Sequence, residues 1–229
     1  MKLKKFNKIL FLGRHNCPYT YKVLKFLRIK SKIVYFYKSK KIGENLNIQN
    51  RHLKCDYIFC FRSYFILRKK HLDAPKFKAI NFHPSTPSYR GSGGVNFAIY
   101  NKENFFGCTA HIINEKIDDG PILNVRRFKV KKNEGVEEVL KKTHKCLFMQ
   151  AKNIISKLYK SSENLEKMIT KSKKEKWSKF SKKNKDLNDF YQISLKSSKK
   201  DFKQKILATK YFNFKPHIIF NSKKFILDE

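Results

Sequence analysis

Short apolar segments that suit buried strands alternate with segments of helical periodicity as far as residue 159 of this chain. Alternating strands and helices predict an α/β fold with a doubly wound, mostly parallel sheet. The last expected helix has a clear apolar stripe at helical spacing. Helices are expected at residues 20–28, 64–72, 93–101 and 136–159. Strands are expected at residues 8–13, 32–37, 56–61, 77–83, 107–113 and 122–130.

The composition changes after residue 159, which predicts a main domain over residues 1–159 and an extension over residues 160–229. The extension begins with a lysine-rich stretch that we interpret as a solvated linker with Trp177 as one apolar anchor. Short helices follow, and residues 217–227 form an expected β-hairpin. Because an isolated hairpin is only marginally stable, we expect it to pack on the main domain or on the second subunit of a homodimer.

Polar side chains stand where two of the expected strands end. Asn81 and His83 flank Phe82, so they point to the same face of the sheet. Pro84 cannot donate to a strand ladder, so this strand should end there and lead into a turn-rich loop. The next strand leads into a polar turn that contains Asp118. Ligands of open α/β sheets bind at such strand ends, so the sequence predicts a site with an amide, an imidazole and a carboxylate.

These motifs resemble those of the folate-dependent formyltransferases. The matching patterns are Asn-x-His-Pro-Ser at residues 81–85, Tyr-Arg-Gly at 89–91, Gly-x-Thr-x-His at 107–111 and Asp-x-Gly-Pro-Ile at 118–122. That family includes glycinamide ribonucleotide formyltransferase, methionyl-tRNA formyltransferase and the sugar-nucleotide N-formyltransferases. The resemblance, weaker outside these motifs, implies a Rossmann-like catalytic domain over residues 1–159, with Asn81, His83 and Asp118 as the catalytic trio.

Formyl transfer to an amine needs a donor to the developing oxyanion and an acceptor for the proton of the amine. We expect Asp118 to raise the pKa of His83, so that a protonated His83 stabilises the oxyanion. Asn81 offers an N–H group to the formyl oxygen. The resemblance also implies the donor N10-formyltetrahydrofolate and no metal ion. Its pterin is expected at Tyr64, Phe65 and Ile66 after the third strand, and at Asn114 and Glu115 in the turn before Asp118.

The acceptor amine is less constrained by the sequence. Tyr89 and Arg90 are either anchors of the loop or contacts to an anionic substrate. The loop after the first strand, residues 13–19, lacks the glycines with which the purine-pathway members hold a phosphate. The segment after Tyr159 is too short for the C-terminal β-barrel of the tRNA-directed members. These features favour a sugar-nucleotide N-formyltransferase, with the amine of a nucleotide-linked amino sugar as acceptor.

Two further interpretations follow from the net charge of +35. The chain could formylate methionyl-tRNA, or it could be a non-catalytic basic protein that binds nucleic acid on the same fold. However, only eight of the 53 basic residues are Arg, which nucleic-acid readers favour for its bidentate contacts. Lysines spread over almost every segment are also typical of a biased codon composition, and both explanations of the charge stay open.

The same residues allow other arrangements. His83, His111 and Asp118 could bind a metal ion, and Ser85, His83 and Asp118 could form a hydrolase triad, although no G-x-S-x-G motif is present. His111 is either a support for the trio or a core histidine. Five scattered cysteines without a C-x-x-C pair indicate reduced, buried thiols and a cytoplasmic protein. The N-terminal apolar run is too short for a signal peptide, and no segment is long enough to span a membrane.

Overall fold

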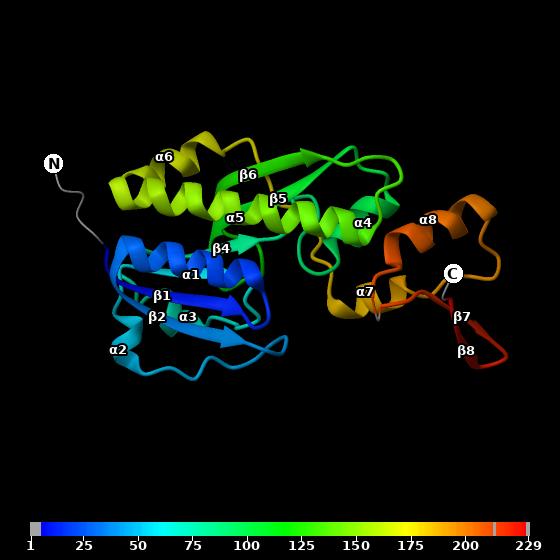
Figure 1. Cartoon of the computed structure of the whole chain (residues 1–229), viewed down its shortest axis with the longest axis horizontal. Coiled ribbons are helices and arrows are strands. Elements are labelled where there is room, and N and C mark those ends of the chain that lie inside the picture. Colours follow the sequence, from blue (N-terminus) through cyan, green and yellow to red (C-terminus); the bar gives the residue numbers. More distant parts are fainter. Residues whose placement is uncertain (1–5, 213, 228–229) are drawn as a thin grey trace.

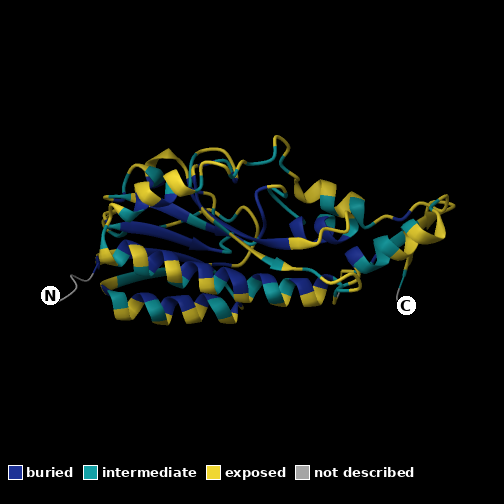
Figure 2. Ribbon diagram, turned by 90° about the horizontal axis from the view of Figure 1, so that it is seen from above, coloured by how far each residue is buried: buried dark blue, intermediate teal, exposed yellow. Residues whose placement is uncertain are grey.

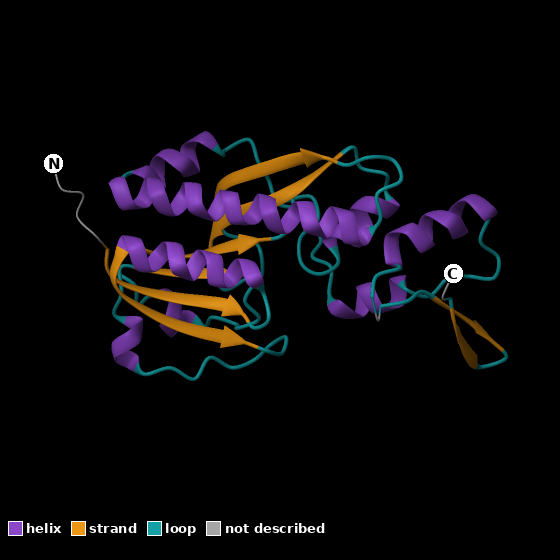
Figure 3. Cartoon of the chain, in the orientation of Figure 1, coloured by secondary structure: helices purple, strands orange, loops and turns teal. Residues whose placement is uncertain are grey.

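The structure, a computed structural model, describes residues 6–212 and 214–227. Its centre is a six-stranded sheet in the order β2-β1-β3-β4-β5-β6, with helices on both faces (Figures 1 and 3). All six expected strands are present. The strands are β1 (Phe6–Arg14), β2 (Ser31–Ser39), β3 (Tyr57–Phe61), β4 (Lys78–His83), β5 (Phe105–Ile112) and β6 (Ile122–Lys129). The helices of this part are α1 (Pro18–Lys30), α2 (Asn50–Leu53), α3 (Lys69–Leu72), α4 (Gly94–Tyr100) and α5 (Val136–Lys160).

The first four strands in the sheet order are parallel, whereas β5 is antiparallel to both β4 and β6. The expected doubly wound, mostly parallel sheet is therefore confirmed. The antiparallel register places His111 opposite Asn81 and Thr109 opposite His83. This pairing brings the Gly-x-Thr-x-His motif alongside the Asn-x-His motif.

The main core lies on the face of the sheet covered by α1 and α5 (Figures 1 and 2). Phe82 on β4 is fully buried there, together with Phe59 of β3 and Leu147 of α5. Strand side chains alternate, so Asn81 and His83 point to the opposite face. Burial of Phe82 thus fixes β4 in the register that directs both polar side chains away from the main core.

The helix expected at residues 64–72 is mostly absent, because α3 contains only its last four residues. Arg62 has a left-handed backbone with φ 52°, which directs the chain away from a helix directly after β3. The Tyr64 backbone N–H then donates to Ser39 Oγ (2.8 Å), and its carbonyl accepts from Gly43 (3.2 Å). These bonds to the region after β2 hold residues 63–68 in an irregular loop.

The expected solvated linker is also wrong in part. It contains α6 (Asn164–Lys171), which buries Leu165 and Met168 in the main core. The rest of the extension forms α7 (Asn184–Phe190) and α8 (Lys199–Thr209). Helix α8 packs on α4, and Asn96 Nδ2 donates to the carbonyl of Ala208 (2.8 Å). The division of the chain at residue 159 stays a prediction.

Strands β7 (His217–Phe220) and β8 (Lys223–Ile226) form the expected hairpin. Its turn has positive φ angles at Asn221 (46°) and Ser222 (61°), as the twist of a two-residue hairpin requires. The hairpin projects from the rest of the chain (Figure 1), and Phe220 and Phe225 are 53% and 46% exposed. The expectation that it packs on the main domain is therefore wrong.

All five cysteines are buried and unpaired, as expected. Over the described ranges, none of the helices is both long enough and apolar enough to cross a membrane.

Candidate active site

The structure brings the three predicted catalytic residues together at the end of β4. Asp118 Oδ2 lies 3.3 Å from His83 Nδ1, and Asp118 Oδ1 lies 3.4 Å from Asn81 Nδ2. The backbone N–H of Gly91 donates to Asp118 Oδ2 (3.3 Å). Both His83 and Asp118 are more than nine-tenths buried. Their catalytic role remains a prediction, but their geometry is that of one connected polar group.

A tight turn carries Asp118 to this position. Asp118 has a left-handed backbone with φ 46°, a conformation that Asp tolerates better than most residues. Gly120 packs so closely that a Cβ atom there would lie 1.9 Å from the carbonyl oxygen of Ile112. Arg90 holds the turn from the other side, because its Nε donates to the Ile117 carbonyl (2.8 Å) and its Nη1 pairs with Asp119 (3.0 Å).

His111 contacts the trio, which resolves its two sequence interpretations in favour of a supporting position. Its Nδ1 lies 2.8 Å from the carbonyl oxygen of Ile112, and a carbonyl can only accept, so Nδ1 carries the proton. Its Nε2 lies 3.1 Å from Asn81 Nδ2 and 3.4 Å from Asp118 Oδ1. The amide nitrogen of Asn81 therefore faces both His111 and Asp118. The signal in the sequence was the alternation that puts Thr109 and His111 on one face.

The expected protonation of His83 is wrong for this structure. Burial lowers the pKa of His83 below its ordinary value, and this outweighs the opposite influence of the Asp118 carboxylate. Burial also acts to raise the pKa of Asp118, but His83 and hydrogen bonds from His111 and Gly91 lower it to about 2. The site at neutral pH thus contains an ionised Asp118 that accepts the Nδ1–H of a neutral His83.

The other nitrogen of this ring, His83 Nε2, is buried and has no hydrogen-bond partner among the described residues. The same holds for Ser85 Oγ, which packs against the start of α4 where a Cβ on Gly94 would lie 2.3 Å away. Ser85 is therefore not paired with His83, which argues against the hydrolase triad. Within the described ranges, no group of three or more His, Cys, Asp or Glu side chains could hold a metal ion.

The two predicted substrate residues have partners within the chain. Tyr89 donates from its hydroxyl to Glu103 (2.7 Å) and accepts from Asn101 (3.0 Å), which ties the loop after β4 to the end of α4. The Arg90 side chain is only 12% exposed and is bound to the turn before Gly120. Both residues act as loop anchors here, and their contact with a substrate stays a prediction.

The predicted pterin residues border one apolar cluster. Phe65 and Ile113, which precedes Asn114 and Glu115, pack on the same buried residues around Leu67. The backbone groups of Tyr64 are already bonded to Ser39 and Gly43, whereas those of Ile66 have no partner in the described ranges, and Ile66 is 55% exposed. Asn114 accepts from the backbone of Lys116 (3.1 Å). Ile66 is therefore the residue of this set best able to bind a ligand through its backbone.

A strap, defined as residues 172–184 between α6 and α7, was missed as part of the site. Trp177 at its centre lies with its ring centroid 5.0 Å from that of His111 and 6.1 Å from that of His83. Its Nε1–H donates to the carbonyl of Gly120 (2.8 Å). The sequence singled out Trp177 as an anchor, but nothing in it indicated the surface to which Trp177 binds.

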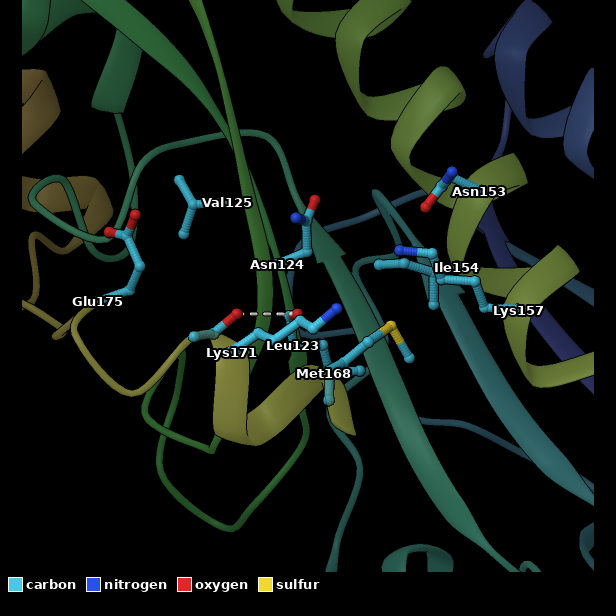
Figure 4. A pocket seen from close by; sticks show the side chains of 10 residues that line it. Leu123, Asn124, Val125, Asn153, Ile154, Lys157, Met168, Lys171 and Glu175 are labelled. Atoms are coloured by element: carbon cyan, nitrogen blue, oxygen red, sulfur yellow. Dashed lines mark hydrogen bonds between the residues drawn. The ribbon is translucent and has the colours of Figure 1, made fainter. Parts of the chain in front are cut away.

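The first residues of the strap border a pocket of about 210 Å³ between β6, α5 and α6 (Figure 4). Ser172 Oγ donates there to the carbonyl of Leu123 (2.9 Å). None of the trio lines this pocket. It marks where the strap leaves α6, and the polar cluster at the end of β4 remains the candidate site.

The fold and the trio together define the class of protein. The profile of the formyl transferase family matches residues 13–151, and this chain belongs to that family.

Among sequence relatives, a methionyl-tRNA formyltransferase of Prochlorococcus marinus is 29% identical over 74% of this chain and 44% of its own length. The chain spans 29–44% of the length of the first curated relatives that it matches. A sugar N-formyltransferase of a Shewanella species superposes with a TM-score of 0.71 at 15% identity, covering 96% of both chains. An N-formyltransferase of Helicobacter canadensis was solved with folinic acid and dTDP-3-aminofucose. It superposes with a TM-score of 0.66 at 16% identity, covering 94% of this chain and 85% of its own. At these identities the structural likeness shows the fold alone.

Proposed function

We propose that this protein transfers a formyl group from N10-formyltetrahydrofolate to the amine of an amino sugar, which is linked to a nucleotide. The observation that carries the proposal is the contact of Asp118 with both His83 and Asn81 at the end of β4. Membership of the formyl transferase family supports the reaction. The solved sugar N-formyltransferase that matches over 96% of both chains supports the acceptor class.

The donor would supply the formyl carbon that the amine attacks. The bond between that carbon and N10 would break, and the proton taken from the amine would pass from His83 to N10 of the leaving tetrahydrofolate. His83 accepts the proton of the amine at Nε2, the buried nitrogen without a protein partner. Asp118 stabilises the resulting imidazolium through Nδ1–H, which keeps a positive charge beside the reacting centre. Asn81 Nδ2 lies 3.4 Å from Asp118 Oδ1, and the N–H group of this long contact turns to donate to the oxygen on which negative charge develops. None of these steps requires a covalent bond to the protein.

The residues expected at the pterin suit a folate in one respect that the structure shows. Ile66 has free backbone donor and acceptor groups beside an apolar cluster, which matches a flat ring system with polar edges. We therefore assign the edge of the pterin to Ile66, and only side-chain contact to Phe65 and Tyr64. Asn114 and Glu115 lie in the turn that borders the same cluster.

Two arginines favour an anionic acceptor. Arg14 ends β1 and Arg62 follows β3, and neither has a carboxylate partner in the described ranges. Arg62 Nη1 donates to Cys17 Sγ (3.3 Å), and the Arg14 guanidinium lies 4.5 Å from the centre of the Tyr64 ring. Burial lowers the pKa of His144 on α5 to about 3, and the charges of Arg62 and Arg14 act in the same direction. Arg62 directly follows β3, the strand that pairs with the strand of His83. The phosphates of a nucleotide-linked sugar suit this position.

A folate-binding experiment tests the donor. 5-Formyltetrahydrofolate, a stable isomer of the donor, should stabilise the protein by about 2.7 kcal/mol at a concentration 100 times its Kd. In a separate assay with N10-formyltetrahydrofolate, release of tetrahydrofolate should depend on a dTDP-linked amino sugar. The N-acetylated sugar, which lacks the free amine, is the matched control. The absence of any melting shift at saturating ligand would contradict a folate enzyme.

Methionyl-tRNA is the second candidate acceptor, because several curated sequence relatives of this chain carry that name. Formylation of methionyl-tRNA in place of the amino sugar would establish it. Salt-sensitive nucleic-acid binding without folate affinity would instead indicate a non-catalytic basic protein. We assign the protein to the cytoplasm, since its five thiols are unpaired and a reducing compartment maintains that state.

A further inference from the structure

We propose that Trp177 is a positioning residue of the formyl-transfer site, which holds the turn of Asp118 and the ring of His111 in the arrangement that keeps Asn81 against Asp118. This inference rests on the proposed function. Trp177 lies outside the part of the chain that matches the family profile, residues 13–151. The family profile therefore does not include the residue that makes this contact.

The strap is fixed on the near side of Trp177. Glu175 accepts two hydrogen bonds from the Arg127 guanidinium on β6, with distances of 2.6 and 2.7 Å. Such a fork-to-fork pair fixes direction as well as distance. Ser172 is bonded to the carbonyl of Leu123 at the start of the same strand. The residues that precede Trp177 are thus attached to the sheet.

The strap is equally fixed on the far side, where it runs along the loop after β4. The backbone N–H of Ser178 donates to the carbonyl of Pro87 (2.9 Å). Lys182 donates to the carbonyl of Arg90 (3.0 Å) and accepts from Ser92 (2.8 Å). Trp177 therefore sits between two anchored segments, and its side chain has a defined place above the site.

The indole N–H of Trp177 makes one hydrogen bond. It is a donor only, and it donates to the carbonyl of Gly120 at 2.8 Å. Gly120 is two residues after Asp118 and has no room for a side chain against Ile112. The bond therefore connects the strap to the turn whose left-handed residue is the catalytic carboxylate.

The indole ring restricts the two imidazoles. Its plane is inclined by 85° to that of His111 and by 66° to that of His83, which are edge-to-face arrangements. A ring held in this way blocks rotation of His111 away from Asn81. Loss of the contact should misplace Asn81 and Asp118 without removing either of them.

Substitution on the strap tests the role. Trp177→Phe keeps an aromatic ring but removes the N–H, and Trp177→Leu removes both. We expect about a tenfold loss in kcat for Trp177→Phe, the effect of one neutral hydrogen bond, with the KM of both substrates within about twofold. Phe180→Leu is the matched control, because Phe180 lies on the same strap and is 80% exposed. A simple packing role would instead lower the melting temperature and leave kcat unchanged.

A second measurement does not depend on activity. The C2–H signals of His83 and His111 are followed by NMR against pH in the free protein. We expect a change of about half a pH unit or more in at least one midpoint in Trp177→Phe and in Trp177→Leu, and no change in Phe180→Leu. Trp177 is the single tryptophan of the chain, so its fluorescence in the parent protein reports the same titration.

The outcomes separate the two proposals. Unchanged kcat and unchanged histidine titrations in Trp177→Phe would overturn the positioning role. Shifted titrations in a protein that transfers no formyl group would support the contact and overturn the proposed function. A loss in kcat together with a shifted titration supports both.

Discussion

Asp118 Oδ2 lies 3.3 Å from Nδ1 of His83, although one residue ends β4 and the other lies in the turn after β5. The same oxygen also accepts the backbone N–H of Gly91. The carboxylate is therefore tied to both the strand and the loop of the site. The two side chains form one connected pair, and we expect that their contributions to catalysis are not independent.

Removal of either member of the pair should abolish most of the activity. His83→Asn and Asp118→Asn should each lower kcat by a factor on the order of 10², because proton transfer and charge stabilisation both depend on the pair. The double variant should be hardly slower than either single variant. Measurement of kcat for the three proteins checks this, and fully multiplicative losses would show that the two residues work independently.

The pH dependence should follow a neutral His83. Its folded pKa lies below the ordinary 6.5, so the imidazole at pH 7 is already in the form that accepts a proton. We expect kcat/KM to be flat from about pH 8 to 6.5 and to fall at lower pH, where His83 becomes protonated. A rate that rises as pH falls from about 7 to 6 would show that the protonated ring is the active form.

Arg62 should contribute to binding of the anionic acceptor although its backbone conformation is unfavourable. An arginine with φ 52° carries a left-handed penalty of about 1 kcal/mol, which Arg62→Gly removes. The same change removes the bond from Arg62 Nη1 to Cys17 Sγ (3.3 Å). We therefore expect the free energy of unfolding to stay within about 1 kcal/mol while the KM of the anionic acceptor rises about tenfold. Ser222→Gly is the matched control, since Ser222 also has a positive φ but lies in the hairpin turn. An unchanged KM in Arg62→Gly would exclude contact with the acceptor.

The hairpin should mediate self-association. Ile218, Phe220 and Phe225 share one face of β7 and β8, and the two phenylalanines are about half exposed. Such a patch on a marginal hairpin is stabilised by a second copy. We expect the chain to sediment as a dimer and the variant with Phe220→Thr and Phe225→Thr to sediment as a monomer. A parent protein that is monomeric at micromolar concentration would contradict this.

The strands and the long helix were predictable because burial imposes short-range periodicity on the sequence. Phe82 between Asn81 and His83, for example, determined both the strand and the direction of its polar side chains. The loop after β3 was not predictable, since Ser39 of a different strand captures the Tyr64 backbone. The helix expected at residues 64–72 does not form there, because residues far apart in the sequence bind the backbone of the loop instead.

The candidate trio was predictable from motifs, but its protonation was not. The sign of the pKa change at His83 depends on the balance between burial and one carboxylate, and burial is a property of the folded chain. Trp177 was recognised as an anchor in a lysine-rich segment. Its place against His111 depends on the Gly120 carbonyl and on the ends of the strap, which no local pattern encodes.

The strap also sets an order of events during synthesis of the protein. Because the chain is synthesised from its N-terminus, β1 to β6 and α5 leave the ribosome before residues 172–184. The trio would then exist on a nascent chain without Trp177 against its histidines. Translation must continue past Lys182, whose backbone bonds to Arg90 and Ser92, before the site is covered. A nascent chain that stops before residue 172 would therefore contain Asn81, His83 and Asp118 but would lack Trp177.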